Sequence, residues 1–126
     1  MALPQVTASP SLPFQAVKAA TTTGVGASPV FSLSDQRGAY QNLMLEAVGA
    51  GATPTTVTVS LSASLDGGTT FQTVSGQSAI ALVATSTGTI ALITGLPVGP
   101  LYQVNIGTLT LGSATSVTVW GCLSGA

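Results

Sequence analysis

The chain has 126 residues, of which 45% are hydrophobic and only 4% are charged, and it contains no histidine. Typical soluble domains carry about 25% charged residues. Two cations cannot neutralise many phosphates or form a basic patch, which argues against nucleic acid or a membrane surface as a partner. Without histidine the commonest acid–base catalyst and the Ser-His-Asp arrangement are missing, so we expect a non-enzymatic protein without a cofactor.

A metal centre is not expected either. Zinc needs several Cys, His or carboxylate ligands, and the chain offers one cysteine and three scattered acids. Asp66 precedes two glycines and is expected in a turn, whereas Asp35 stands beside Arg37 in a polar loop. These surroundings also argue against a catalytic carboxylate pair that would include Glu46. The single cysteine, Cys122, allows no internal disulfide.

The beginning of the chain is rich in proline. Pro4, Pro10 and Pro13 stand among small polar residues, which disfavours regular structure and favours an extended conformation. There is no basic stretch followed by a continuous apolar run, so a signal peptide is not expected. We therefore expect an extended arm over residues 1–13 and a single domain over residues 14–126.

From residue 14 onward, short β segments alternate with stretches rich in Gly, Pro, Ser and Thr. The expected strands, in chain order, are 14–22, 29–33, 43–49, 56–65, 69–74, 79–84, 88–93, 101–111 and 117–123. Segment 43–49 is apolar at both odd and even positions apart from Glu46, which predicts a strand buried on both faces. A short helix over 36–45 is a weak alternative, because Gly38 and the absence of capping residues argue against it.

The clearest strand is 56–65, where every second residue is apolar and the others are Ser or Thr. This period of two predicts one face in a core, with Leu65 on that face. Asp66-Gly67-Gly68 then predicts a tight hairpin, because glycine adopts positive φ angles and aspartate hydrogen-bonds the turn backbone. The returning strand, 69–74, is expected to place Phe71 in the core.

The last two strands show the same alternation. In 101–111 the apolar residues occupy even positions before Gly107 and odd positions after it, which predicts a bulge or bend at this glycine. In 117–123 the odd positions are expected to face the core. Trp120 then points the other way, and we expect it to be covered by the arm, a second sheet or a neighbouring subunit. Cys122 is expected to pack as a small hydrophobe.

About nine strands and no convincing helix predict an all-β, antiparallel β-sandwich of about 8–9 strands, jelly-roll-like. Strand order is not readable from the residues, so a jelly roll and an immunoglobulin-like sandwich both remain open. A surface with so few charges resists self-association poorly. We therefore expect that neighbouring subunits cover much of the surface. The alternative is a monomer whose surface is coated with Ser and Thr.

Two stretches resemble a known family. The first is Val57-Thr58-Val59-Ser60-Leu61-Ser62-Ala63-Ser64-Leu65-Asp66-Gly67-Gly68-Thr69-Thr70-Phe71, a strand that ends in a Ser-Leu-Asp-Gly-Gly-Thr turn followed by an aromatic residue. The second begins with Gly95-Leu96-Pro97, continues through Leu101-Tyr102-Gln103-Val104-Asn105-Ile106, and ends with Thr115-Ser116-Val117-Thr118-Val119-Trp120. In this order they resemble small β-sandwich structural proteins of tailed bacteriophages, over about residues 55–120. Members of that family often carry an Arg in the penultimate strand, where this chain has Leu101 or Gln103.

The resemblance implies a virion protein, first of all a capsid decoration or cement protein on the outer surface of the head. It implies the major capsid protein as the partner, often a homotrimer, synthesis in the host cytoplasm, and no catalytic residues. An extended arm or an edge strand adds backbone hydrogen bonds across subunits. The expected contacts are Pro4, Val6, Pro10 and Pro13 of the arm, together with the cations Lys18 and Arg37. The alternatives are another head or tail component, or a fibre or tail-tip module that binds glycan through Trp120, Tyr102 and Asn105.

Overall fold

The computed structural model describes residues 5–7, 13–24, 30–33 and 40–125, and in these residues every regular element is a β-strand. The strands are β1 (Gln5–Thr7), β2 (Phe14–Ala20), β3 (Val30–Ser32), β4 (Tyr40–Gly49), β5 (Thr56–Ser64), β6 (Gln72–Thr73), β7 (Ile80–Ala84), β8 (Thr87–Gly88), β9 (Ala91–Pro97), β10 (Leu101–Thr110) and β11 (Val117–Gly125). The all-β prediction is confirmed. The suggested helix is wrong where it is described, because residue 40 already begins β4.

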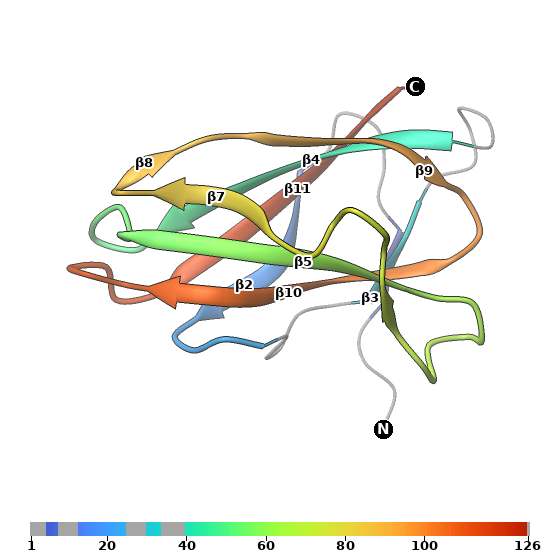
Figure 1. The fold of residues 1–126 in the computed structure, drawn as a ribbon, viewed down its shortest axis with the longest axis horizontal. Helices are drawn as coiled ribbons and strands as arrows, with labels where there is room; N and C mark the ends of the chain where they lie inside the picture. The colour runs from blue at the N-terminus through green and yellow to red at the C-terminus, as the bar shows by residue number, and fades with distance from the viewer. Residues whose placement is uncertain (1–4, 8–12, 25–29, 34–39, 126) are drawn as a thin grey trace.

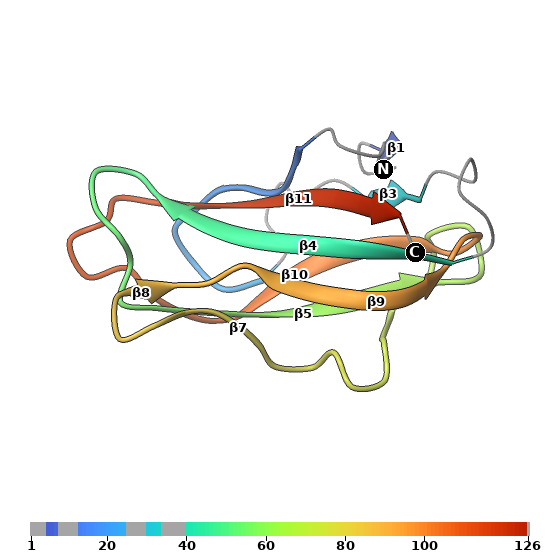
Figure 2. The same cartoon turned by 90° about the horizontal axis from the view of Figure 1, so that it is seen from above.

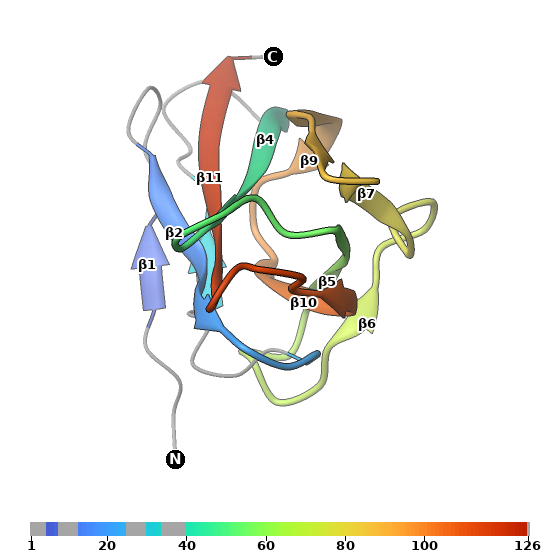
Figure 3. The same cartoon turned by 90° about the vertical axis from the view of Figure 1, so that its left-hand side faces the viewer.

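The strands form two sheets that face each other across the core (Figures 1 and 2). Sheet A has the order β1-β3-β10-β5-β7-β8, with β6 paired to β5, and sheet B has the order β2-β11-β4-β9. All pairs are antiparallel except β1 with β3. The end-on view in Figure 3 shows sheet B and sheet A as two layers around the interior. The predicted antiparallel sandwich is therefore confirmed.

The antiparallel pairs are nested along the chain. β2 pairs with β11, β3 with β10, β4 with β9, and β5 with β7. Successive pairs alternate between sheet B and sheet A. One consequence matters for the outer surface: the last strand, β11, lies between β2 and β4 in the middle of sheet B.

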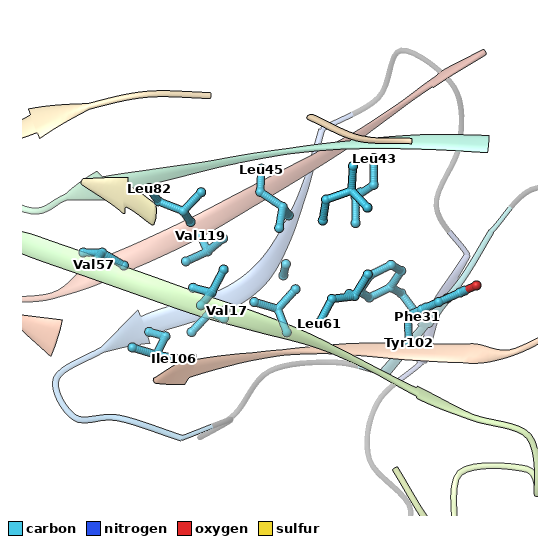
Figure 4. Packing of buried hydrophobic residues seen from close by; sticks show 14 of the residues in the cluster. Val17, Phe31, Leu43, Leu45, Val57, Leu61, Leu82, Tyr102, Ile106 and Val119 are labelled. Carbon is cyan, nitrogen blue, oxygen red and sulfur yellow. The ribbon is translucent and has the colours of Figure 1, made fainter. Parts of the chain in front are cut away.

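The core lies between the sheets and is built from alternate residues of the long strands. Figure 4 shows side chains from both sheets meeting there, including Val17, Leu43, Leu45 and Val119 from sheet B and Phe31, Val57, Leu61, Leu82, Tyr102 and Ile106 from sheet A. Each of these side chains is at most 1% exposed. Full burial of such a side chain contributes about 1.5–3 kcal/mol to the free energy of folding. Burial of the apolar side chains at every second position therefore drives the packing of the two sheets.

An aromatic cluster joins the two sheets at one part of this core. The rings of Phe14 and Phe31 are 4.9 Å apart between centroids, and those of Phe31 and Tyr102 are 6.0 Å apart. The Tyr102 hydroxyl donates a hydrogen bond of 2.6 Å to the carbonyl oxygen of Pro97. Burial of this phenol raises the pKa of Tyr102 to about 12.

The predicted bulge and the predicted turn at Asp66 are confirmed, but the hairpin is not tight and the returning strand is not 69–74, since β5 ends at Ser64 and β6 spans only Gln72–Thr73. The register of β10 against β5 shifts between Ile106 and Thr108, which places a bulge at Gly107. Asp66 holds the turn after β5, where Gly67 and Gly68 have φ angles of 78° and 97°. Its Oδ1 accepts hydrogen bonds from the backbone N–H groups of Thr69 and Thr70 and from the hydroxyl of Ser64.

Several side-chain placements were wrong. Leu65 was expected in the core but is 89% exposed. The strand ends one residue earlier, at Ser64, which is buried; its hydroxyl donates a hydrogen bond to Asp66 and accepts one from the N–H of Gly68. Phe71 lies just before the two-residue strand β6 and is only half-buried, while Val74 packs against the core.

Two strand predictions also need correction. The segment 88–93 is not one strand, because the chain leaves β8 in sheet A and enters β9 in sheet B. The strand β4 is not buried on both faces, since Val48 is 45% exposed in addition to exposed Glu46.

The predicted arm is described only in part. Residues 5–7 form β1, which pairs in parallel with β3 at the edge of sheet A and sets Val6 opposite Phe31 in register. Residues 1–4 and 8–12 lie outside the described residues. The division into an arm and a single domain stays a prediction.

Candidate functional site

The side of sheet B that points away from the core, here called the outer face, is the candidate site. In β4 the inward residues Leu43 and Leu45 are fully buried, so their neighbours point outward. The same alternation holds in β11, where Val117, Val119 and Leu123 face the core. The outer face comprises Gln15 and Lys18 of β2, Thr118, Trp120 and Cys122 of β11, Tyr40, Asn42, Met44, Glu46 and Val48 of β4, and Leu92 of β9.

Strand register places apolar side chains of the outer face side by side. Met44 lies opposite Cys122 on one neighbouring strand and opposite Leu92 on the other. Side chains directly opposite on neighbouring strands contact one another. Two residue pairs further along, at the next position on the same face, Trp120 lies opposite Glu46. The apolar side chains therefore form a continuous band across three strands.

A shallow depression of about 130 Å³ interrupts this band. It is lined by Pro13, Met44, Leu45, Glu46, Ile90, Trp120, Gly121 and Cys122. Trp120 is half-buried here and shares the depression with Pro13. The expectation of a covered tryptophan is thus met only in part, since Trp120 is partly exposed in the single chain.

Exposed hydrophobic side chains are concentrated on this face. Of the five large hydrophobic side chains that are exposed in the described part of the chain, four lie on or beside it. They are Tyr40, Val48, Ile90 and Leu92, with exposed fractions of 58%, 45%, 61% and 58%. Contiguous exposed apolar patches on soluble proteins mark surfaces that bind another protein or a ligand. The outer face therefore has the character of a protein contact surface.

The outer face carries few charged side chains, and they lie on different strands. Among the described residues it carries one acid, Glu46 near its middle, and one base, Lys18 on the outermost strand β2. Both side chains are exposed. They lie on the two strands that flank β11, so β11 separates them within one copy of the chain.

The opposite surface of the molecule differs in kind. The residues of β5 and β10 that point away from the core are mostly polar, including Ser60, Ser62, Gln103 and Asn105. Gln103 Nε2 and Asn105 Oδ1 are buried without a hydrogen-bond partner. The concentration of apolar side chains is thus specific to sheet B.

A second, larger pocket of about 450 Å³ lies between the turn after β5 and the β9–β10 connection. It is lined by Ala63, Leu65, Asp66, Thr70, Gln72, Thr73, Val74, Pro97, Pro100 and Tyr102. Its volume is in the range of small-molecule sites. The hydrogen bond from the N–H of Thr70, followed by that from the Ser64 hydroxyl, lowers the pKa of Asp66 to about 2. The carboxylate is therefore ionised throughout the physiological range.

The predicted contact residues fall in three places. Pro13 and Lys18 are exposed at the start of β2 and along it, beside the outer face. Val6 lies in β1 at the edge of sheet A. Pro4, Pro10 and Arg37 lie outside the described residues. The structure thus places Lys18 on sheet B, Pro13 directly before it, and Val6 on sheet A.

The residues predicted for glycan binding do not form one open surface. Trp120 lies on the outer face of sheet B, whereas Asn105 points away from the core on sheet A. The Tyr102 side chain is 1% exposed and its hydroxyl is bonded to Pro97. The prediction that these three residues form one glycan-binding surface is therefore wrong.

The sequence pattern did not identify most residues of the outer face as contact residues. Met44, Val48, Ile90 and Leu92 were not named as contact residues. A signal for two of them was present, because Met44 and Val48 made segment 43–49 apolar at both odd and even positions. In an antiparallel strand, apolar residues at both odd and even positions place apolar side chains also on the face that points away from the core.

The two acids that the structure describes lie on different sheets or their connections and do not form a pair. Glu46 is on sheet B and Asp66 follows β5 of sheet A, while Asp35 is outside the described residues. Within the described ranges no three Cys, Asp or Glu side chains come together, and no helix is long and apolar enough to cross a membrane. Comparison of the chain with protein-family models, curated proteins and solved structures gives no match.

Proposed function

We propose that this chain is a structural protein of a bacteriophage virion that decorates the outer surface of the head and stabilises it. The observation that carries the proposal is the outer face of sheet B, where four exposed hydrophobic side chains surround a band of Met44, Trp120 and Cys122. Such a surface gains about 25 cal/mol per Å² of apolar area when another protein covers it. The resemblance of residues 55–120 to phage β-sandwich proteins names the kind of assembly.

A structural role also agrees with the chemistry of the described residues. The two acids that the structure describes are far apart in the fold, one on sheet B and one after β5. Asp66 is engaged by three hydrogen-bond donors that hold its own turn. These features favour a non-enzymatic building protein over a catalyst.

Attachment to the shell is proposed through the N-terminal strand and its surroundings. β1 is a three-residue parallel strand at the edge of sheet A, and β3 is its neighbour in that sheet. Edge strands present unpaired backbone N–H and C=O groups that another chain can bind. Many copies on a symmetric shell convert a weak contact of this kind into stable attachment. The partner is then the major capsid protein.

We also propose that the sandwich is a jelly roll. The four nested pairs, from β2–β11 outermost to β5–β7 innermost, form one long antiparallel hairpin that alternates between the two sheets. Jelly rolls are double-sheet folds of eight strands that occur in viral capsid domains. This arrangement supports the jelly roll over an immunoglobulin-like order.

The test is co-sedimentation with shells assembled from the candidate major capsid protein. We expect the full-length protein to sediment with shells at a fixed ratio, and a variant lacking residues 1–12 to remain in the supernatant. The deletion keeps Pro13, which lines the depression beside Trp120. Leu65→Ser is the control, because Leu65 is 89% exposed and follows β5, which is three strands away from β1 in sheet A. Full-length protein that ignores shells would overturn the proposal, and a deletion variant that still binds would exclude the arm.

One observation favours the recognition module as a second candidate. The pocket of about 450 Å³ combines an ionised carboxylate, two threonines and a glutamine with apolar walls, the mixture common in ligand sites. Screening the protein against a glycan array, with Asp66→Asn as the comparison, tests this. Binding that Asp66→Asn abolishes supports the module, and silence across the array excludes it.

A further inference from the structure

We propose that a second copy of this chain covers the outer face of sheet B, so that two copies pack face to face about a twofold axis along β11. The proposal deepens the proposed function, because it names the partner of the surface that carries that function, and it rests on it. The outer face needs an occupant that is apolar over most of its area, since Met44, Trp120 and Cys122 lie on the two central strands, β4 and β11.

The charge of the face narrows the choice of occupant. Glu46 lies opposite Trp120, inside the apolar band. Covering a carboxylate without a partner is costly, so the occupant must supply a cation at that point. Lys18 is the one basic residue that the structure describes, and it is exposed on the same face. The face therefore carries both halves of an ion pair, and one copy can supply what another copy needs.

The strand order places these two residues correctly for a twofold contact. β11 lies between β2 and β4. A twofold axis along β11 exchanges these flanking strands, so that β2 of each copy lies over β4 of the other. In a twofold interface every contact occurs twice. Lys18 of one copy then approaches Glu46 of the second, and the reverse pair forms at the same time.

The two residues also lie at similar heights along the strands. Gln15 of β2 lies opposite Trp120, which is itself opposite Glu46. Val17 lies one step further, opposite Val119, and Lys18 follows it. At about 3.3 Å per residue the offset is roughly 5–7 Å. A lysine side chain spans that length, and the rotation of about 30° between packed sheets adjusts it further.

The size of the face sets the strength of the contact. An axis along β11 brings β2, β11 and β4 into the contact and leaves β9 at its rim. Three strands about 4.8 Å apart and about eight residues long cover roughly 400 Å² on each copy. Two copies would bury roughly 800 Å², in the range of weak and transient contacts. We therefore expect a reversible dimer whose population depends on protein concentration. The homotrimer that the resemblance implies would join two different surfaces in a ring, whereas this contact pairs one surface with itself.

Sedimentation equilibrium of the purified full-length chain tests the proposal. Over a wide range of concentrations we expect a monomer–dimer equilibrium. Glu46→Lys and Lys18→Glu each bring like charges together twice, so each should raise the dimer dissociation constant at least about tenfold. The double variant, Lys18→Glu with Glu46→Lys, restores opposite charges and should return the constant to within a few-fold of the original. Thermal unfolding of all four proteins verifies that each is folded.

Each result of these measurements either supports or overturns the proposed dimer. Single variants that weaken the dimer, with rescue by the double variant, support the proposal. A protein that stays monomeric at every concentration, a trimer, or a dimer unaffected by the charge changes overturns it. Shell co-sedimentation is then repeated with Glu46→Lys. If that variant loses shell binding while the original protein is monomeric, the outer face belongs to the capsid contact, and the proposed function stands without the dimer.

Discussion

Replacement of Tyr102 by phenylalanine removes one hydroxyl from the interior without emptying space around the ring. The Tyr102 side chain is 1% exposed, and its hydroxyl donates a 2.6 Å hydrogen bond to the carbonyl oxygen of Pro97. A hydrogen bond of this kind contributes about 0.5–1.5 kcal/mol, and an acceptor left unsatisfied in the interior costs about 1–3 kcal/mol. Pro97 itself is exposed, so water can replace the lost donor. We therefore expect a loss of about 1 kcal/mol, at the lower end of these ranges.

The same substitution has a signature at high pH. Burial raises the pKa of Tyr102 from 10.0 to about 12 in the folded protein. The fold therefore favours the neutral phenol. The stability that this phenol contributes is fully present below pH 10 and is lost as the pH rises from 10 towards 12. Tyr102→Phe lacks the ionisable group, so the difference in stability between the two proteins should shrink over that interval.

Urea unfolding at pH 7 and at several values between pH 9 and 12, followed by fluorescence of Trp120, measures both effects. Trp120 is the single tryptophan of the chain. A loss of about 1 kcal/mol corresponds to a decrease in Tm of about 3–5 °C for a chain of this size. Tyr40→Phe is the matched control, because Tyr40 is 58% exposed. The reasoning fails if Tyr102→Phe is as stable as the original protein at pH 7, or if the two proteins respond identically to alkaline pH.

Three further perturbations follow from the structure. Leu61→Ala should destabilise the fold by about 2–5 kcal/mol, because Leu61 is fully buried; an unfolding midpoint unchanged in urea would contradict this placement. Gly49→Ala should lower the free energy of unfolding by about 1–3 kcal/mol or more, because the added Cβ would clash with the backbone carbonyl oxygen of Ala52. Gly107→Ala is the control in thermal unfolding and should have a small effect, because the nearest atom to its Cβ is 3.8 Å away. Asp66→Asn should lower Tm at pH 7 and should abolish the acid sensitivity of the original protein, whose turn loses stability as the pH falls from 3.8 towards 2; equal acid titration curves for the two proteins would refute that role.

Local features of the fold were readable from the residues because their causes are local. The turn at Asp66-Gly67-Gly68 depends on positive φ angles and on hydrogen bonds within five residues. The bulge at Gly107 was visible as a change of phase in the apolar pattern of β10. The inward positions of β11 followed from simple alternation. Each prediction required only neighbouring residues.

The two main errors have different causes. Leu65 continued the apolar alternation of β5, but the strand ends at Ser64, whose hydroxyl takes part in the turn at Asp66. Alternation alone does not show where a strand ends. The segment 88–93 looked like one strand, yet its two halves pair with different sheets. This outcome is not visible in a window of ten residues, because it depends on pairing partners far away in sequence.

The sequence alone determined that the chain is an all-β protein, where its turns lie, and which residues along each strand share a face. A period of two specifies a face, but it does not specify which strand lies alongside or what covers that face. Only the tertiary structure decided that β4, β9 and β11 are neighbours, and thereby brought Met44, Leu92 and Cys122 together. It also decided that this band lies on the outside of a two-layer sandwich, because the single core lies between the two sheets and the outer side of sheet B remains exposed.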